Sequence, residues 1–270
     1  MIQSDWRDTT RLTNWTAPVR ISGEQGPQGP QGPQGPNFNL INYSTWTVGT
    51  SGTQAGFNAY GTAPATENSI ELGLDPYGRT NPLWKSTADI TTPNSLDGGW
   101  LTSFFPVNDS KTYRFVTYFK RLTMDGNTYC GVLSNGYYGA LRLDGTLDDD
   151  AYFIYNYDPP LLDRWYMIIG YVHSKDTTRT TSLGGVYDMV TGQKVADCAD
   201  FKWKPGTTQA LHRAFYFGCA TAGSTQYFWG PRVEECDGTE MPLEQIISYT
   251  PKCLGLFAYS DRGSIVGMHE

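Results

Sequence analysis

The sequence is poor in charge and has no cluster of cations. Asp, Glu, Lys and Arg make up 17% of its 270 residues, and 20 basic residues against 27 acidic ones give a net charge of −7. Proteins that bind nucleic acid place clustered Lys and Arg against the phosphates. We therefore expect no nucleic-acid partner.

Long apolar runs are missing as well. No window holds the roughly 18 or more consecutive apolar residues that a membrane-spanning helix needs. Residues 1–8 also lack the charged and then apolar pattern of a signal peptide. We expect neither membrane insertion nor Sec-dependent export.

The five cysteines form no metal or redox motif. No pair has CxxC spacing, and an odd number cannot pair completely within one chain. We interpret Cys130, Cys198, Cys219, Cys236 and Cys253 as reduced, mostly buried, small apolar residues. Synthesis and assembly in a reducing cytoplasm fit this interpretation.

Motifs of catalysis are absent too. His173, His212 and His269 lack recognisable partners, and the sequence contains no GxSxG, HExxH or phosphate-binding GxxxxGK[ST]. Pairs of carboxylates that cleave glycosidic bonds are diagnosed by their separation in space, so a glycosidase stays open as an alternative. The repetitive β-helix of depolymerase tailspikes hardly fits this length. We expect a protein that is not an enzyme.

What the sequence does contain is a strict glycine repeat in residues 23–37. Glycine opens five consecutive triplets there, and most of them read Gly-Pro-Gln. In a collagen triple helix every third residue lies on a crowded axis where only glycine fits, and proline presets the extended backbone angle. We therefore predict a collagen-like, homotrimeric triple helix on Gly23, Gly26, Gly29, Gly32 and Gly35.

The repeat is short for a triple helix. Its fifteen residues, at about 3.1 Å each, give a stalk of roughly 45 Å. We expect neighbouring domains to hold the three chains together. The third triplet position is never proline, so prolyl hydroxylation is not needed, which suits a bacterial or viral product. Composition alone also allows a flexible Pro/Gly-rich linker.

Residues 38–249 predict an all-β, antiparallel head. Segments rich in aromatic and β-branched residues alternate with turn signals such as Asp75-Pro-Tyr-Gly78 and Asp97-Gly-Gly99. In residues 112–120 the alternation predicts one buried and one solvated face, whereas residues 165–172 are apolar on both faces, as in a central strand. We expect about ten strands in a two-sheet jelly-roll sandwich. Further strands are expected at 69–74, 185–189, 212–217, 226–229 and 231–234, with a hairpin at 188–195.

The flanking segments are short. Residues 1–22 hold Trp6 and Trp15 but are too few for an independent core, so we interpret them as an attachment or trimerisation arm. A helix is expected near the end of the head, at residues 242–247. Residues 250–270 are interpreted as a C-terminal tail.

Gly-Pro-Gln triplets followed by a β-rich head resemble bacteriophage and prophage tail fibres. The stretches Asp75-Pro-Tyr-Gly-Arg-Thr-Asn-Pro-Leu-Trp84, Asp97-Gly-Gly-Trp100 and Asp200-Phe-Lys-Trp203, with Lys111-Thr-Tyr-Arg-Phe115 and Arg164-Trp-Tyr-Met167, resemble the carbohydrate-binding-module type of jelly roll found in fibre tips. This resemblance implies a trimeric virion fibre, made in the host bacterial cytoplasm. Its N-terminus would attach to other tail or baseplate proteins, and its tips would bind a bacterial surface glycan or an outer-membrane receptor.

A glycan site needs exposed aromatic rings beside polar groups, because sugars present flat CH faces bordered by hydroxyls. Three tryptophans lie beside turns and charged residues, and two tyrosines follow Asn135-Gly136. The candidates are therefore Trp84, Trp100, Trp203, Tyr137 and Tyr138, each of which could instead pack against a sheet edge.

No cofactor is expected, apart from a structural calcium ion of the kind that jelly-roll modules often carry. Asp148, Asp149 and Asp150 offer hard carboxylate oxygens for it, although three adjacent acids also form ordinary solvated turns. The EF-hand spacing is absent.

Two other functions stay open beside receptor binding. The sandwich could be a structural joint or trimerisation module of a tail or baseplate, with no ligand. Less in keeping with the sequence is a polysaccharide depolymerase. A bacterial collagen-like adhesin would normally need an export signal.

The repeat predicts a mass. Three chains of 30.0 kDa should give a particle of about 90 kDa, because a collagen helix requires three strands. Light scattering coupled to size-exclusion chromatography measures it directly. A particle with the mass of one chain would contradict the triple helix.

Overall fold

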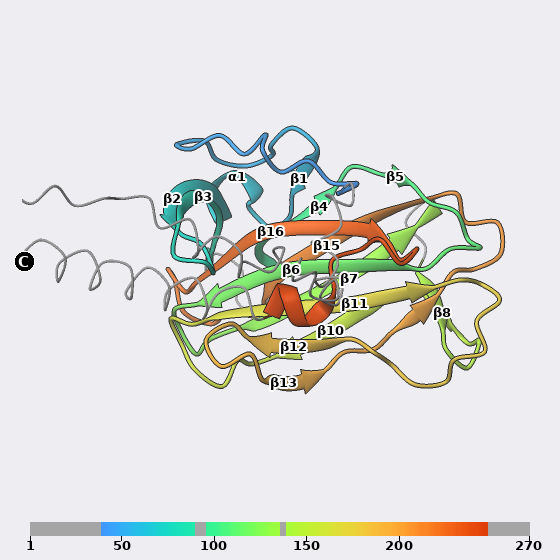
Figure 1. Ribbon diagram of the computed structural model, residues 1–270. Coiled ribbons are helices and arrows are strands. Elements are labelled where there is room, and N and C mark those ends of the chain that lie inside the picture. Colours follow the sequence, from blue (N-terminus) through green and yellow to red (C-terminus); the bar gives the residue numbers. More distant parts are fainter. Residues whose placement is uncertain (1–38, 90–95, 136–138, 248–270) are drawn as a thin grey trace, which may run out of the picture. The chain divides into compact units, whose positions relative to one another are not determined.

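The computed structural model describes residues 39–89, 96–135 and 139–247, which form two packed β-sheets (Figure 1). The predicted arm, the collagen-like glycines, Tyr137, Tyr138 and the C-terminal tail lie outside the described residues. Within the described part, no helix is long and apolar enough to cross a membrane.

The larger sheet has ten strands and the smaller has six. The short helix α1 (Pro64–Glu67) precedes the first strand of the larger sheet, and a second short helix spans residues 243–247. The larger sheet contains β2 (Asn68–Leu74), β3 (Thr80–Thr87), β6 (Tyr113–Arg121), β8 (Ala140–Arg142), β9 (Leu147–Asp148), β11 (Trp165–His173), β12 (Gly185–Asp188), β13 (Lys194–Asp197), β14 (Phe201–Lys202) and β16 (Thr225–Glu235). The smaller sheet contains β1 (Phe57–Ala59), β4 (Leu96–Thr102), β5 (Phe105–Pro106), β7 (Asn127–Ser134), β10 (Tyr152–Tyr157) and β15 (Gln209–Phe217).

Eight of these strands have jelly-roll connectivity. Their antiparallel pairs are nested in sequence, because β3 pairs with β16, β4 with β15, β6 with β11 and β7 with β10. The pairs fall alternately in the larger and the smaller sheet, as if one long hairpin were wrapped into a sandwich. The all-β jelly-roll prediction for the head is therefore confirmed.

The space between the sheets is filled mainly by aromatic rings. Trp84, Trp100, Phe115, Phe119 and Phe228 are all at most 1% exposed and come from both sheets. Burying each large apolar side chain contributes roughly 1.5–3 kcal/mol. This layer fixes which face of every central strand points inward and which points outward.

Strand β6 differs from its prediction, because both of its faces are buried. Its outward residues Val116 and Tyr118 belong to a second cluster that includes Ile246 and packs against Tyr43 and Tyr77. In Figure 1 the helix of residues 243–247 lies over this face of the larger sheet. The expected solvated face is thus covered by segments far away in sequence, which the alternation in residues 112–120 could not reveal.

One turn signal and one expected break between strands are strand irregularities in the structure. Asp97-Gly-Gly99 lies inside β4, where Gly98 and Gly99 have φ angles of +116° and +125°. A Cβ on Gly99 would be 2.2 Å from the carbonyl oxygen of Ala214, so only glycine lets β15 approach this closely. Gly230 joins the two strands expected at 226–229 and 231–234 into the single bulged strand β16.

Other expectations are confirmed. β12 and β13 form the hairpin predicted at 188–195, and β11 is a central strand paired with β6, β12 and β14. Cys130, Cys198 and Cys219 are free and buried, and Cys236 is free and partly buried. Cys253 lies outside the described residues.

His212 provides a test of the core. Its ring lies edge-on to Trp100 and Phe115, and burial lowers its pKa to about 4. Because this pKa is lower than in the unfolded chain, neutral His212 stabilises the fold above about pH 6.5. As the pH falls from 6.5 towards 4, the free energy of unfolding should decrease by about 3 kcal/mol in total. Denaturant unfolding across this range should show the loss.

The decrease in the free energy of unfolding between pH 6.5 and 4 should be smaller in His212→Gln, because glutamine does not titrate in this range. NMR should find the imidazole of His212 neutral at pH 5. An imidazole that titrates near pH 6.5 would contradict the packing described.

Candidate functional site

Three of the predicted ligand-binding residues are core residues. Trp84, Trp100 and Trp203 have no exposed surface. The indole N–H of Trp84 donates to Asn68 Oδ1 at 2.8 Å, and that of Trp203 donates to the Lys111 carbonyl at 3.1 Å. Their prediction as sugar-stacking residues is wrong, because a tryptophan beside a turn can still point between the sheets.

The acidic cluster is paired with arginines. Asp148 contacts Arg142 at 3.0 Å, and Asp150 contacts Arg213 at 2.7 Å. Among the residues described, no group of three or more His, Cys, Asp or Glu side chains could hold a metal ion. These pairings give the calcium prediction no support.

The smaller sheet presents an aromatic surface on its outer side. In β15, Ala210, His212 and Ala214 contact the core, so Phe215 and Phe217 point outward. Tyr129 lies opposite Phe215 in the neighbouring strand β7. We call this surface the aromatic face, and it consists of Tyr60, Tyr129, Tyr152, Phe215 and Phe217.

The rings of the aromatic face form a continuous row. Ring centroids are 5.4 Å apart for Phe217 and Tyr129, 5.2 Å for Tyr129 and Tyr152, and 6.3 Å for Tyr152 and Phe215. Tyr60 stacks on Phe215 at 4.0 Å. Phe215 is buried beneath, whereas the three tyrosines and Phe217 are half-buried and reach the surface.

Arg213 lies in the middle of this row. Its guanidinium is 3.9 Å from the ring centroid of Tyr152 and pairs with Asp150. A cation–π contact and an ion pair therefore fix the position of Arg213. Gly131 makes room for this arrangement. A Cβ there would be 2.9 Å from the ring of Tyr152 and 2.3 Å from the Ala151 carbonyl oxygen.

The tyrosine hydroxyls stay protonated at neutral pH. Burial raises the pKa of Tyr60, Tyr129 and Tyr152 above the usual value of 10. Each can therefore donate a hydrogen bond, and Tyr129 donates one to the side chain of Asn156. The face presents ring surfaces with hydroxyl and amide groups, over the buried guanidinium of Arg213.

A groove of about 610 Å³ adjoins the aromatic face and shares Tyr152 with it, and Asp150, the partner of Arg213, also lines the groove. This size falls within the roughly 300–1,000 Å³ of ordinary ligand pockets. Tyr155, which is 64% exposed, lines the groove. Asp144 lines it too, and hydrogen bonds from Thr146 lower the pKa of this carboxyl. A carboxyl that acts as a general acid needs a raised pKa instead.

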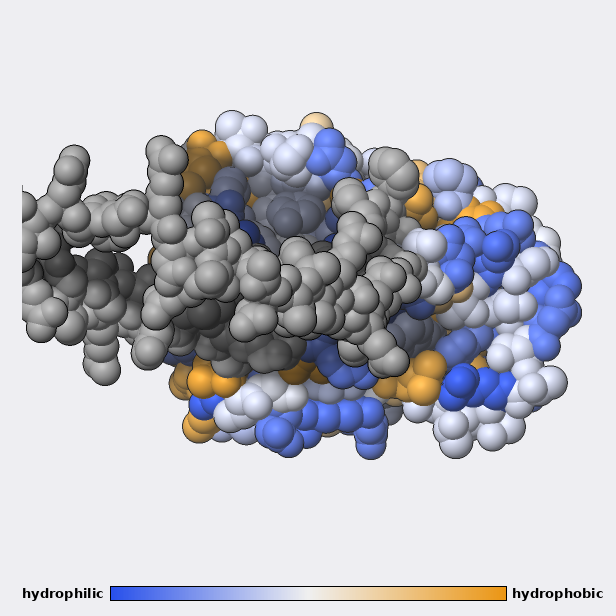
Figure 2. Space-filling view, in the orientation of Figure 1, coloured by the Kyte–Doolittle hydropathy of each residue, from blue (hydrophilic) through white to orange (hydrophobic). Residues whose placement is uncertain are grey.

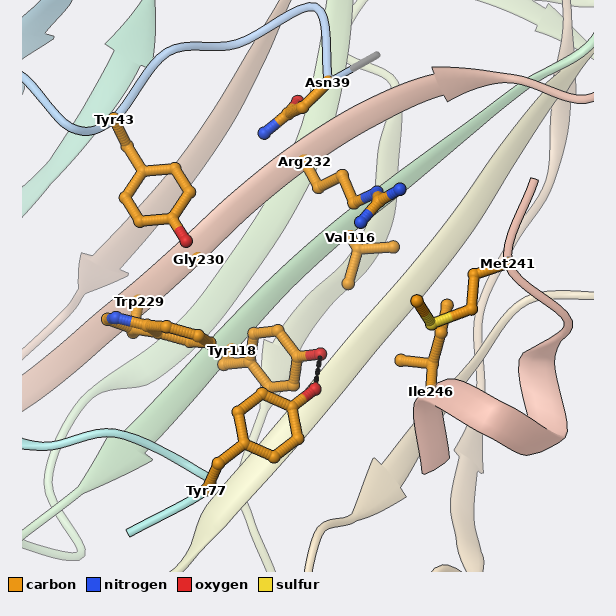
Figure 3. Close-up of a pocket in the computed structure, with 10 residues that line it drawn as sticks. All are labelled: Asn39, Tyr43, Tyr77, Val116, Tyr118, Trp229, Gly230, Arg232, Met241 and Ile246. Atoms are coloured by element: carbon orange, nitrogen blue, oxygen red, sulfur yellow. Dashed lines mark hydrogen bonds between the residues drawn. The ribbon is translucent and has the colours of Figure 1, made fainter. Parts of the chain in front are cut away.

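A second hollow lies on the outer side of the larger sheet (Figure 3). It is a mostly apolar cavity of about 230 Å³, lined among others by Tyr43, Tyr118 and Trp229. Tyr77 and Tyr118 join their hydroxyl oxygens at 2.7 Å across it. Hydrophobic residues elsewhere on this side form small separate patches between polar ones (Figure 2).

The sequence interpretation missed the aromatic face. The strand expected at 212–217 does place Arg213, Phe215 and Phe217 on one side. His212, Ala214 and Tyr216 occupy the other side, and both sides carry aromatic residues. Which side faces the core depends on the pairing of β15 with β4 and β7. The alternation therefore predicted two different faces but not which of them is buried.

No protein-family model matches this chain, and no curated protein matches it. Lectin II from Ulex europaeus is similar in structure, at 10% identity and a TM-score of 0.44, over 75% of this chain and 99% of the lectin. The CBM22-1 xylan-binding domain of Paenibacillus barcinonensis Xyn10C has 10% identity and a TM-score of 0.33, over 74% of this chain and 95% of that domain.

An arabinose-bound MgGH51 α-L-arabinofuranosidase has 13% identity and a TM-score of 0.36. The match covers 76% of this chain and 28% of the enzyme, so the chain spans little more than a quarter of its length. At these levels of similarity the site has to be interpreted from its own residues.

The Tyr77–Tyr118 contact predicts a measurable effect on stability. Tyr118→Phe removes one hydroxyl of the pair and should lower the free energy of unfolding by about 1 kcal/mol, as is usual for a lost hydrogen bond. Urea unfolding measures it. Tyr155→Phe, at a tyrosine that is 64% exposed, is the matched control and should be neutral. Equal stability of the two variants would contradict the contact.

Proposed function

We propose that this chain is one protomer of a homotrimeric phage or prophage tail fibre, whose head binds a bacterial surface glycan through the aromatic face. The observation that carries the proposal is the row of half-buried tyrosines around Arg213 on the outer side of the smaller sheet. Solvent-facing rings in a row offer stacking surfaces for successive sugar units.

Polar groups beside the rings favour a sugar over a purely apolar ligand. Tyr60, Tyr129 and Tyr152 carry protonated hydroxyls, and Asn156 is exposed at the edge of the row. Such groups match the hydroxyls that border the CH face of a sugar ring. The adjoining groove would accept further units of a chain or a branch.

Binding without cleavage is part of the proposal. Asp148 and Asp150 are held by arginines, and Asp144 is kept ionised by Thr146. A glycosidase needs one carboxyl with a raised pKa beside a second, ionised one. The lowered pKa of Asp144, in the groove, is the opposite of what a general acid needs.

The fibre itself is proposed from the Gly-Pro-Gln repeat of residues 23–37. Three heads on one stiff stalk would engage a repetitive polymer together, so weak single-site binding would be multiplied through effective concentration. The arm of residues 1–22 would attach the trimer to other tail or baseplate proteins of the virion. The protein would be made in the cytoplasm of the host bacterium.

Tyr152→Ala should weaken binding of the isolated trimer to saccharides of its host by about two- to tenfold per site. Lost stacking of one aromatic ring costs about 0.5–1.5 kcal/mol, and 1.4 kcal/mol is a factor of ten. Glycan-array screening identifies the saccharide, and calorimetry measures the affinity. Val190→Ala, at a residue 64% exposed beside the β12–β13 hairpin, is the control and should bind as the parent does.

Two results would change the conclusion. Binding to no bacterial saccharide would favour a structural joint of the tail or baseplate. Steady release of reducing ends from host polysaccharide would make the protein an enzyme.

A further inference from the structure

A second hollow adjoins the cavity shown in Figure 3. This hollow of about 600 Å³, lined also by Asn81 and Pro82, shares Asn39, Tyr43 and Trp229 with the cavity of 230 Å³. Both lie on the larger sheet, whereas the aromatic face belongs to the smaller one. They are therefore a different site from the one proposed above.

Trp229 carries an unmet hydrogen-bond donor at this place. Its side chain is 6% exposed, and its indole N–H has no partner in residues 39–89, 96–135 and 139–247. An indole N–H is only a donor, and leaving it buried without an acceptor destabilises the folded state. Because Trp229 lines both hollows, an acceptor atom of a bound molecule would offset this cost.

Arg232 is the one charged residue among the described residues that line the cavity. This arginine shares the buried carboxylate of Glu234 with Arg114. Arg79 lies over the ring of Tyr77 and pairs with buried Asp75. The described lining therefore offers a guanidinium and no carboxylate.

The walls are suited to a ring with an apolar side. Tyr43, Tyr77 and Tyr118 surround Trp229 at centroid distances of 6.0, 5.8 and 5.3 Å. The bulge at Gly230 turns both Trp229 and Arg232 outward, so ring surface and guanidinium reach the same cavity (Figure 3). A volume of 230 Å³ is smaller than a drug-sized pocket and fits one sugar unit better than a chain.

We infer that this cavity is a second binding site, which takes a terminal sugar acid. The carboxylate of the sugar contacts Arg232, its apolar face packs against Trp229, and a hydroxyl that reaches the edge of the indole accepts a hydrogen bond from its N–H. The site selects acidic chain ends, and the aromatic face binds the body of a chain.

The probes are glucuronic acid, glucose and acetate, tested on the full trimer by calorimetry and by saturation-transfer NMR. We expect glucuronic acid to bind, and glucose and acetate to bind at least tenfold more weakly. Arg232→Gln should reduce the affinity for glucuronic acid at least tenfold. Arg179→Gln, which removes an exposed arginine elsewhere, should leave it unchanged.

Met241→Trp provides a second variant in case Arg232→Gln does not fold. Met241 lines the cavity and is 38% exposed, so a larger side chain there fills the space with little disturbance of the core. It should abolish binding, while Tyr152→Ala on the other sheet should not affect it. Absence of binding by the parent protein, equal binding of glucose, or binding that survives filling of the cavity would each overturn the inference.

Discussion

The structure depends on the packing of aromatic side chains between two sheets whose strands are paired in nested order. Once Trp84 and Phe228 of the larger sheet face Trp100 of the smaller one, the orientation of every central strand is set. A shift by one residue would turn these rings to solvent and bring the outer residues inside. The composition of both outer surfaces is thus a consequence of the core.

The two outer surfaces are used differently. On the larger sheet, the outward residues of β6 and β11 are covered by Tyr43, Tyr77 and the helix of residues 243–247, beside a confined cavity and the hollow next to it. On the smaller sheet, the outward rings of β7, β10 and β15 stay half-buried at the surface. A broad surface suits the middle of a polymer and a confined cavity suits its end, which gives the two proposed sites complementary roles.

Local sequence was sufficient for the fold class but not for the site. Alternation and turn residues predicted β11, the β12–β13 hairpin and the sandwich, because those signals act between neighbours in the chain. Trp84, Trp100 and Trp203 were misassigned because their burial depends on strands far away in sequence. Trp84 pairs with Phe228 of β16, Trp100 pairs with Ala214 of β15, and Trp203 packs on Tyr113 of β6. Tyr129, Tyr152 and Phe215 form one surface only after β7, β10 and β15 have paired.

The central claim is that the aromatic face binds sugar, and a crystal structure of the trimer with a fragment of host polysaccharide tests it most directly. The account predicts sugar rings packed on Tyr129 and Tyr152, with hydroxyls in contact with Asn156. A fragment bound only elsewhere on the head, with these three side chains left uncovered, would contradict it.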